Sequence, residues 1–244
     1  MDTINQPLIR IEKVSKDFGS ITALKDVTID INKGEFVFIT GHSGAGKTTL
    51  LKLILREMTP DFGKIIIEGT DIVTLDDKLV PMLRQKIGCV FQDFKLINER
   101  TVRENVEVAL AVLDVDEKEW QGRVDQVLKL VGLSGRSELF PKQLSGGELQ
   151  RVSMARALVV NPKIILADEP TGNLDWETSE GILDLLITIN KEGKTVIVAT
   201  HNKMLVEKAG GRVVKISHGK VESDINSDKP LADKSKMKVK VEEV

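Results

Sequence analysis

The chain contains a single cysteine and no tyrosine among its 244 residues. One cysteine cannot form a disulfide within the chain, which fits a reducing compartment. Cys89 lies in the apolar run 87–91, where we expect a buried and unreactive thiol. The sequence lacks any run of the roughly 18 to 20 apolar residues that cross a bilayer, and residues 1–6 do not resemble a signal peptide. We therefore expect a cytoplasmic chain that is not itself a pore.

An excess of positive charge is also missing. The formal net charge is −2 and the isoelectric point is near 6.0, which argues against a protein that binds nucleic acid. The chain is 41% hydrophobic and 30% charged. These values and the length suit one large α/β domain, or such a domain with a lobe inserted into it.

The pattern GxxxxGK[ST] occupies residues 41–48, between an apolar stretch and a helical one. Its glycines permit positive φ angles and a close backbone approach, so that successive N–H groups converge on an anion. The helix that begins near Gly46 adds its own unpaired N–H groups. Lys47 would reach the β- and γ-phosphates of a nucleoside triphosphate, and the Thr48 hydroxyl would bind Mg²⁺. The predicted nucleotide-binding residues of this loop are Gly41, His42, Ser43, Gly44, Ala45, Gly46, Lys47, Thr48 and Thr49.

Two kinds of strand pattern occur. Residues 8–14 and 27–31 alternate apolar and polar side chains, which is typical of antiparallel strands with one solvated face. Residues 36–40, 164–167 and 195–200 are nearly unbroken apolar runs, which are typical of parallel strands covered on both faces. The sequence thus predicts an N-terminal antiparallel sheet and a central parallel sheet.

Helical patterns lie between the strands of the central sheet. Thr101 and Glu104 form a capping box, and residues 120–131 have helical spacing, so we expect an inserted helical lobe at about residues 93–160. The predicted domain is 1–222. The polar, charged segment 223–244 is expected to be a disordered tail; the alternative is a weak basic patch that contacts anionic lipid through its lysines.

Two adjacent carboxylates, Asp168 and Glu169, follow the apolar run 164–167, where a parallel strand delivers side chains to a ligand crevice. Asp168 can hold Mg²⁺, and Glu169 can orient or deprotonate the attacking water. Gln92 follows another apolar strand, and its amide could meet the metal or that water. Taken alone, each acid would be an ordinary acidic residue at the start of a loop. A lone histidine such as His201, at the end of the run 195–200, is more often a structural residue that forms a hydrogen bond. Together with the P-loop, the carboxylates predict a hydrolytic site.

Residues 144–148 read LSGGE before a helix predicted over 149–159. Ser145 and Glu148 match the capping box S-x-x-E. The same helix start presents a serine hydroxyl and glycine N–H groups, so it is also a potential anion site. Both interpretations are compatible.

With this motif added to the P-loop, the chain resembles the ATP-binding cassette (ABC) family, whose signature is LSGGQ. The resemblance covers about residues 8–222, with the motifs in the family's order. It implies an α/β P-loop NTPase fold with a RecA-like parallel-sheet core, an N-terminal antiparallel β subdomain and an inserted helical subdomain. It also implies an ATPase that uses ATP and Mg²⁺ and forms a head-to-tail homodimer around two ATP molecules.

The resemblance implies a role for each matching residue. The catalytic residues would be Glu169, His201 as the switch histidine, and Lys47. The metal ligands would be Thr48, Gln92 and Asp168. In addition to the P-loop, nucleotide contacts would come from Phe18 stacked on adenine, from Gln92, and from Ser145, Gly146 and Gly147 on the γ-phosphate held by the opposite subunit.

Three positions depart from the family pattern. Trp176 stands after residues 173–175, at a position where proline is frequent in relatives. Phe18 stands where tyrosine is common, which keeps ring stacking but removes a hydroxyl contact. Glu148 replaces the usual glutamine, and a carboxylate near a γ-phosphate would repel it. We infer that Glu148 points back to its own helix cap.

Residues 167–175 are similar to the branch of the family that holds cell-division (FtsE), lipoprotein-release (LolD) and macrolide-export cassettes. The segment 90–96, followed by 100–106, is most similar to the FtsE type. This implies an integral membrane subunit resembling FtsX, activation of cell-wall hydrolysis, and a peripheral place on the cytoplasmic face of the inner membrane. Phe94, Leu96 and Ile97 would be apolar anchors for that subunit, or would simply pack inside the helical lobe. The alternatives are an ATPase for lipoprotein release or macrolide-type export, and a soluble ABC protein acting on nucleic acid or ribosomes.

Overall fold

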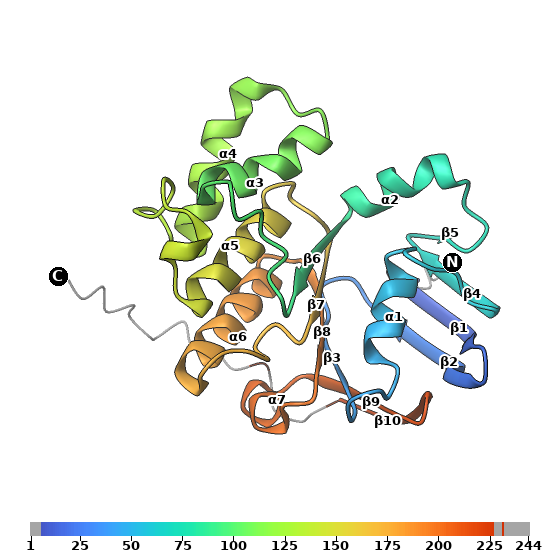
Figure 1. Cartoon of the computed structure of the whole chain (residues 1–244). Helices are drawn as coiled ribbons and strands as arrows, with labels where there is room; N and C mark the ends of the chain where they lie inside the picture. Colours follow the sequence, from blue (N-terminus) through green and yellow to red (C-terminus); the bar gives the residue numbers. More distant parts are fainter. Residues whose placement is uncertain (1–5, 227–230, 232–244) are drawn as a thin grey trace, which may run out of the picture.

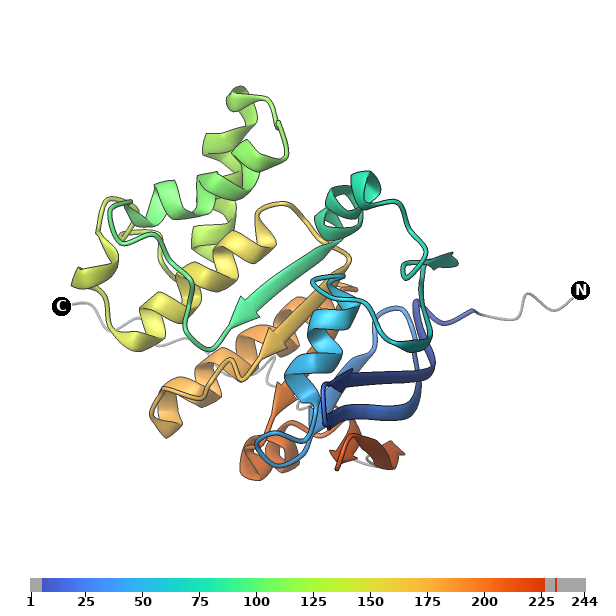
Figure 2. The same cartoon turned by 45° about the vertical axis from the view of Figure 1, so that its right-hand side comes forward.

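The computed structural model of the chain describes residues 6–226 and residue 231. It contains two β-sheets, and helix α1 (Lys47–Ile54) lies between them (Figures 1 and 2). The buried side chains of α1 join those of both sheets in one hydrophobic cluster. The helix that follows the P-loop is therefore held on two sides.

The first sheet is antiparallel, with strand order β2-β1-β4-β5. Its strands are β1 (Ile9–Phe18), β2 (Ile21–Ile31), β4 (Phe62–Ile67) and β5 (Thr70–Asp71). Buried and exposed side chains alternate along β2, with Val27, Ile29 and Ile31 inside. The predicted N-terminal antiparallel sheet is confirmed.

The second sheet has the order β10-β9-β3-β8-β7-β6. Neighbouring strands are parallel from β9 to β6, and β10 pairs antiparallel with β9. The strands are β3 (Phe36–Thr40), β6 (Ile87–Phe91), β7 (Ile164–Asp168), β8 (Thr195–Thr200), β9 (Arg212–Ser217) and β10 (Lys220–Asn226). All three apolar runs that were predicted as central strands lie in this sheet.

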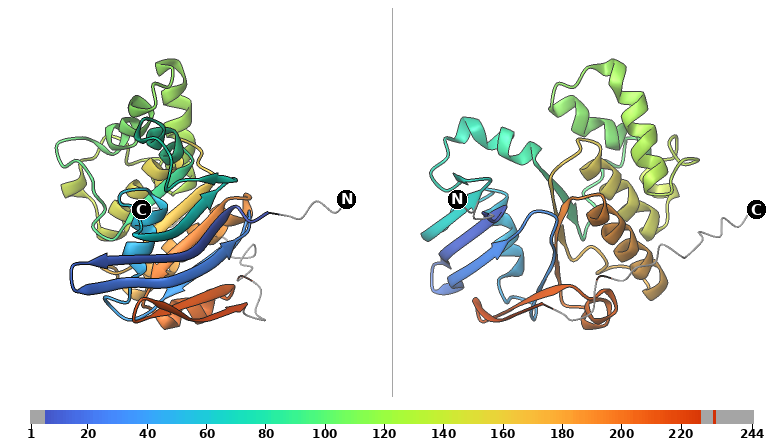
Figure 3. Two further views of the ribbon diagram at one scale, coloured as in Figure 1. Left: turned by 90° about the vertical axis from the view of Figure 1, so that its right-hand side faces the viewer. Right: turned by 180° about the vertical axis from the view of Figure 1, so that it is seen from behind.

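Helices α5 and α6 cover the face of the central sheet opposite α1, and α3 and α4 pack outside α5 (Figure 3). The helices are α2 (Val80–Gln85), α3 (Val102–Val112), α4 (Glu117–Leu130), α5 (Gly146–Leu158), α6 (Trp176–Lys191) and α7 (Lys203–Ala209), with 3₁₀ turns at Asp77–Leu79 and Pro141–Gln143. Thr101 caps α3 in a capping box, as predicted. Helix α5 begins at Gly146, three residues earlier than the predicted start.

Strand β7 shows why the central sheet is apolar throughout. Ile164 and Leu166 face the cluster that contains α1, whereas Ile165 and Ala167 face the cluster that contains α5 and α6. Because β3, β6, β7 and β8 are parallel, their carboxyl ends lie along one edge of the sheet. The residues that follow these strands therefore meet at that edge.

The end of the chain differs from the expected boundary. Residues 223–226, assigned to the tail from their polarity, form the last part of β10 and pair with β9. The hairpin supplies main-chain partners, so apolar burial is not required there. Most of the predicted tail, at 227–230 and 232–244, lies outside the described residues. Across the described ranges, no helix is long and apolar enough to cross a membrane.

Candidate functional site

The P-loop runs from β3 into α1 and is packed tightly against neighbouring main chain. A Cβ on Gly41 would lie 2.3 Å from the Ile216 carbonyl oxygen, and one on Gly46 would lie 2.5 Å from that of Ala23. Gly46 is the N-cap of α1, with φ of 110° and no side-chain cap. The first N–H groups of α1 are thus left for another acceptor, which is the condition for anion binding.

A cleft of about 440 Å³ opens beside this helix start. Ser43, Gly44, Gly46, Lys47, Thr48 and Thr49 line it from the P-loop, and Gln92, Glu169 and His201 line it from the carboxyl ends of β6, β7 and β8. Of the other predicted loop residues, Ala45 is buried, and His42 turns its ring toward His218, with 5.5 Å between the ring centres. Residues from four distant parts of the sequence are therefore brought together.

Three residues of β2 also line the cleft: Ile21, Thr22 and Ala23. The sequence does not predict these residues, because they belong to no motif and precede the P-loop by about twenty positions. Phe18 lies across the β1–β2 hairpin from Ile21 and is 48% exposed. The Lys16 ammonium lies 5.7 Å from its ring centre. The ring is thus exposed at the hairpin tip, next to a strand that lines the cleft.

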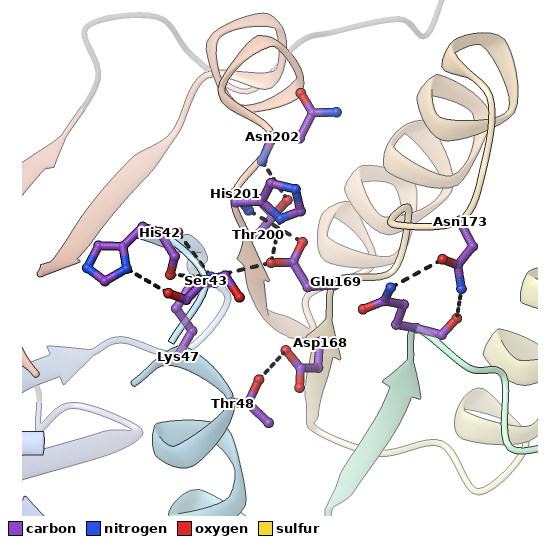
Figure 4. Close-up of polar contacts among 12 residues, drawn as sticks. His42, Ser43, Lys47, Thr48, Asp168, Glu169, Asn173, Thr200, His201 and Asn202 are labelled. Carbon is purple, nitrogen blue, oxygen red and sulfur yellow. Dashed lines mark hydrogen bonds and ion pairs between the residues drawn. The ribbon is translucent and has the colours of Figure 1, made fainter. Parts of the chain in front are cut away.

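Lys47, Glu169 and His201 form a connected group at the floor of the cleft (Figure 4). The Lys47 ammonium donates to the Gly41 and His42 carbonyl oxygens and lies 3.4 Å from Glu169 Oε1. His201 Nδ1 lies 2.9 Å from the same carboxylate oxygen. Glu169 has φ of 46°, a left-handed conformation that is strained for a residue with a side chain. The carboxylate lies between a cation and an imidazole, and both contact the same oxygen.

Thr48 and Asp168 form a second pair. The Thr48 hydroxyl donates to Asp168 Oδ1 at 3.2 Å, across 120 residues of sequence (Figure 4). Burial raises the pKa of Asp168 above its ordinary value, and the adjacent Glu169 charge adds to this effect. A hydroxyl and a carboxylate at the foot of a phosphate-binding loop are the oxygen ligands that suit Mg²⁺. A divalent cation here would also stabilise the buried carboxylate, so these residues fit the metal.

Gln92 and Asn173 join the ends of β6 and β7. The Gln92 amide donates to Asn173 Oδ1 at 3.2 Å, and the Asn173 amide donates to the Gln92 carbonyl oxygen at 3.3 Å. A Cβ on Gly172 would lie 3.0 Å from the Gln92 side chain. Gln92 is therefore tied to the loop after Glu169 as well as lining the cleft.

The predicted signature residues are not among the described residues that line this cleft. Ser145 is the N-cap of α5 and forms a complete capping box with Glu148, so the inference that Glu148 points back to its own cap is confirmed. A Cβ on Gly147 would lie 2.4 Å from Thr178 Cγ2, and one on Gly146 would lie 3.2 Å from Leu174. The start of α5 thus packs on Leu174, in the loop before α6, and on Thr178, in the first turn of α6.

The chain is similar to known proteins over most of its length. A model of the ABC transporter family matches residues 24–172. The chain is 46% identical to the cell division ATP-binding protein FtsE of Bacillus subtilis, over 89% of this chain and 96% of that protein. It is also 46% identical to FtsE of Escherichia coli K12, over 91% of this chain and 100% of that protein. A solved dimeric ATP-binding cassette, described as a post-hydrolysis state bound to ADP and phosphate, superposes with a TM-score of 0.80 at 39% identity, covering 89% of this chain and 98% of that one.

Proposed function

This chain belongs to the ABC transporter family and is an ATPase subunit of it, and we propose that two copies close around two MgATP molecules to drive an FtsX-like membrane subunit in cell division. The observation that supports closure most directly is the incomplete cleft. Lys47, Glu169 and His201 meet within one chain, whereas the Ser145–Gly147 turn does not line their cleft. A second copy would supply that turn.

Each residue of the cleft has a chemical role in this proposal. The P-loop N–H groups and Lys47 bind the β- and γ-phosphates, which releases the ammonium from Glu169. Glu169 orients the attacking water and accepts its proton, and His201 holds the Glu169 carboxylate in place. Thr48 and Asp168, with Gln92, would hold Mg²⁺, which supplies charge neutralisation at the phosphates when bound. Phe18 would stack on adenine. The reaction is ATP and water to ADP and phosphate.

Closure is a population shift in this proposal. ATP contacts both chains only in the closed dimer and so favours that state. Sedimentation of the purified Glu169→Gln chain, in which hydrolysis is blocked, with MgATP, ADP or no nucleotide tests this directly. We expect a dimer with MgATP when hydrolysis is blocked, and monomers otherwise. A monomer under all three conditions would contradict closure.

The membrane partner is proposed to dock beside residues 94–97. Hydrogen bonds from two helices hold this segment. Arg156 of α5 donates to the Phe94 and Lys95 carbonyl oxygens at 2.9 and 2.7 Å. Asn105 of α3 accepts from the Ile97 N–H and donates to the Ile97 carbonyl oxygen. Ile97 remains 38% exposed. A rigid turn with an exposed apolar side chain suits a docking contact. The chain would then lie on the cytoplasmic face of the inner membrane.

Pull-down from detergent-solubilised membranes tests the partner. We expect the full-length tagged chain to recover an FtsX-like protein, and Ile97→Asp to lose it while ATP binding by the purified chain is kept. Met82→Asp, at a residue 60% exposed on α2, is the matched control. Recovery of a lipoprotein-release or export permease would replace the cell-division role, and equal recovery by Ile97→Asp would move the docking surface elsewhere.

A further inference from the structure

Glu148 occupies an unusual electrostatic position at the start of α5. Its carboxylate accepts from the Ser145 N–H and from the Ser145 hydroxyl, both at 2.9 Å. Its other oxygen lies 3.2 Å from Nε of Arg136, in the loop before the signature. The hydrogen bond from the Ser145 N–H, with help from the Ser145 hydroxyl and Arg136, holds the pKa of Glu148 below its ordinary value. The side chain is therefore negatively charged at neutral pH.

That charge conflicts with the proposed use of the turn. In the closed dimer, the Gly146 and Gly147 N–H groups and the Ser145 hydroxyl would bind the γ-phosphate held by the other copy. An anion at a helix start is favoured by the free N–H groups and the helix dipole, but a carboxylate in the same first turn opposes it. Moreover, the Ser145 hydroxyl already donates to Glu148. It must leave that carboxylate before it can donate to a phosphate.

We propose that Arg136 is a positioning residue that lets this turn accept a phosphate despite its glutamate. The guanidinium neutralises Glu148 from the side away from Ser145 Oγ, because it contacts Oε1 while the hydroxyl contacts Oε2. The carboxylate keeps a charged partner when the hydroxyl turns to the phosphate. This inference rests on the proposed closure of two copies around ATP.

No other cation takes this position among the described residues. Arg151, one turn further along α5, donates to the Val131 carbonyl oxygen instead. Arg136 is the residue whose ion pair with Glu148 is seen, and it is well exposed, with 55% of its side chain accessible. An exposed pair acts through charge rather than through packing, so its removal should affect phosphate binding more than folding.

The test measures ATP-driven dimerisation in a Glu169→Gln background, in which closed dimers persist. We compare Arg136→Ala, Glu148→Gln and the double variant by the protein concentration at half dimerisation in saturating MgATP. We expect Arg136→Ala to raise this concentration roughly tenfold, since each dimer contains two such turns and the loss at each is about threefold. Glu148→Gln keeps the cap without the charge, so the double variant should behave like Glu148→Gln alone.

The controls separate this mechanism from a structural effect. Arg123→Ala removes another exposed arginine from the helical lobe, one paired with Glu119 within α4, and should leave dimerisation unchanged. Arg136→Lys keeps the charge and should retain most of the dimerisation. ATP binding by dilute monomers should be equal in all variants.

Two results would overturn the inference. One is normal dimerisation of Arg136→Ala. The other is an equal loss in the Glu148→Gln background, which would show that Arg136 acts on the nucleotide or the fold and not through Glu148. If the Glu169→Gln parent itself fails to dimerise with ATP, the proposed function falls first, and this inference falls with it.

Discussion

Helices α1 and α5 both begin in a glycine-rich turn, but the N–H groups at the two starts have different partners. The N-cap of α1 is Gly46, which offers no side-chain acceptor and opens onto the cleft. The N-cap of α5 is Ser145, which forms a complete capping box with Glu148. An uncapped helix start leaves its N–H groups open to water or to a ligand, whereas a capped one has partners within the chain.

This difference suggests a division of labour. The α1 end is connected to Glu169 and His201 within the same chain, so the groups proposed to bind and hydrolyse ATP already lie together in a single copy. The α5 end is satisfied internally, and in the proposed dimer the Ser145 hydroxyl would have to leave Glu148 before it could contact a nucleotide. We expect substitutions at the first end to alter chemistry, and those at the second to alter closure.

The largest effect is expected for Glu169→Gln. Loss of the carboxylate removes the group that orients and deprotonates water, so phosphate release should fall by about 10²–10⁴-fold while ATP binding is kept. Turnover is measured by phosphate release and binding by a fluorescent nucleotide. The control is Glu192→Gln, at the carboxyl end of α6 and away from the cleft, which should leave turnover unchanged. Unchanged turnover in Glu169→Gln would remove this residue from the chemistry.

Ser145→Arg should have the next largest effect, and at a different step. The long cation fills the turn and disrupts the cap, so we expect ATP-driven dimerisation to be lost and turnover to fall about 100-fold if each site supplies oriented donors from the second copy. Nucleotide binding by the isolated chain should be unchanged, because Ser145 does not line the cleft. Normal dimerisation in this variant would contradict the shared site.

The sequence predicts the motifs at the starts of α1 and α5, but it does not predict all of their neighbours, for a physical reason. The P-loop, the acids and the capping boxes are contiguous patterns, so their residue types alone report local geometry. The contribution of Ile21 to the cleft and the pairing of Arg136 with Glu148 depend on how the chain returns upon itself. The predicted start of the tail at residue 223 differs from the structure for a similar reason. Residues 223–226 pair with β9, and their own polar composition does not indicate this pairing. Which residues lie near each other across loops had to come from the structure.

Gly147→Ala should destabilise the resting chain, without nucleotide. The added methyl would meet Thr178 Cγ2 at 2.4 Å, and overpacking of this kind costs about 1–3 kcal/mol. Urea unfolding measures the free energy of unfolding. Gly122→Ala in α4, with no atom within 4 Å, is the matched control and should stabilise by about 0.5–1 kcal/mol.

Thr178→Ser removes the methyl group that blocks position 147. Combined with Gly147→Ala, it should recover most of the lost stability. If Gly147→Ala alone is as stable as the unmodified chain, then the start of α5 does not pack tightly against Thr178 in the first turn of α6.

The last comparison is between two thiols, Cys89 in β6 and a cysteine introduced beside the α5 turn. Burial raises the pKa of Cys89 from 9.0 to about 12, so at pH 8 its thiolate fraction is about a thousandfold lower than that of an ordinary cysteine. A cysteine placed at the exposed residue Lys142, beside the α5 turn, should react at the ordinary rate. Maleimide labelling should therefore modify Lys142→Cys first, and MgATP should slow only that reaction.

As pH rises toward 12, the rate of Cys89 labelling should climb about tenfold per pH unit, because more of the thiol is ionised. Rapid labelling of Cys89 at pH 8, or its protection by MgATP, would mean that β6 opens with the α5 end and that the two regions do not act separately.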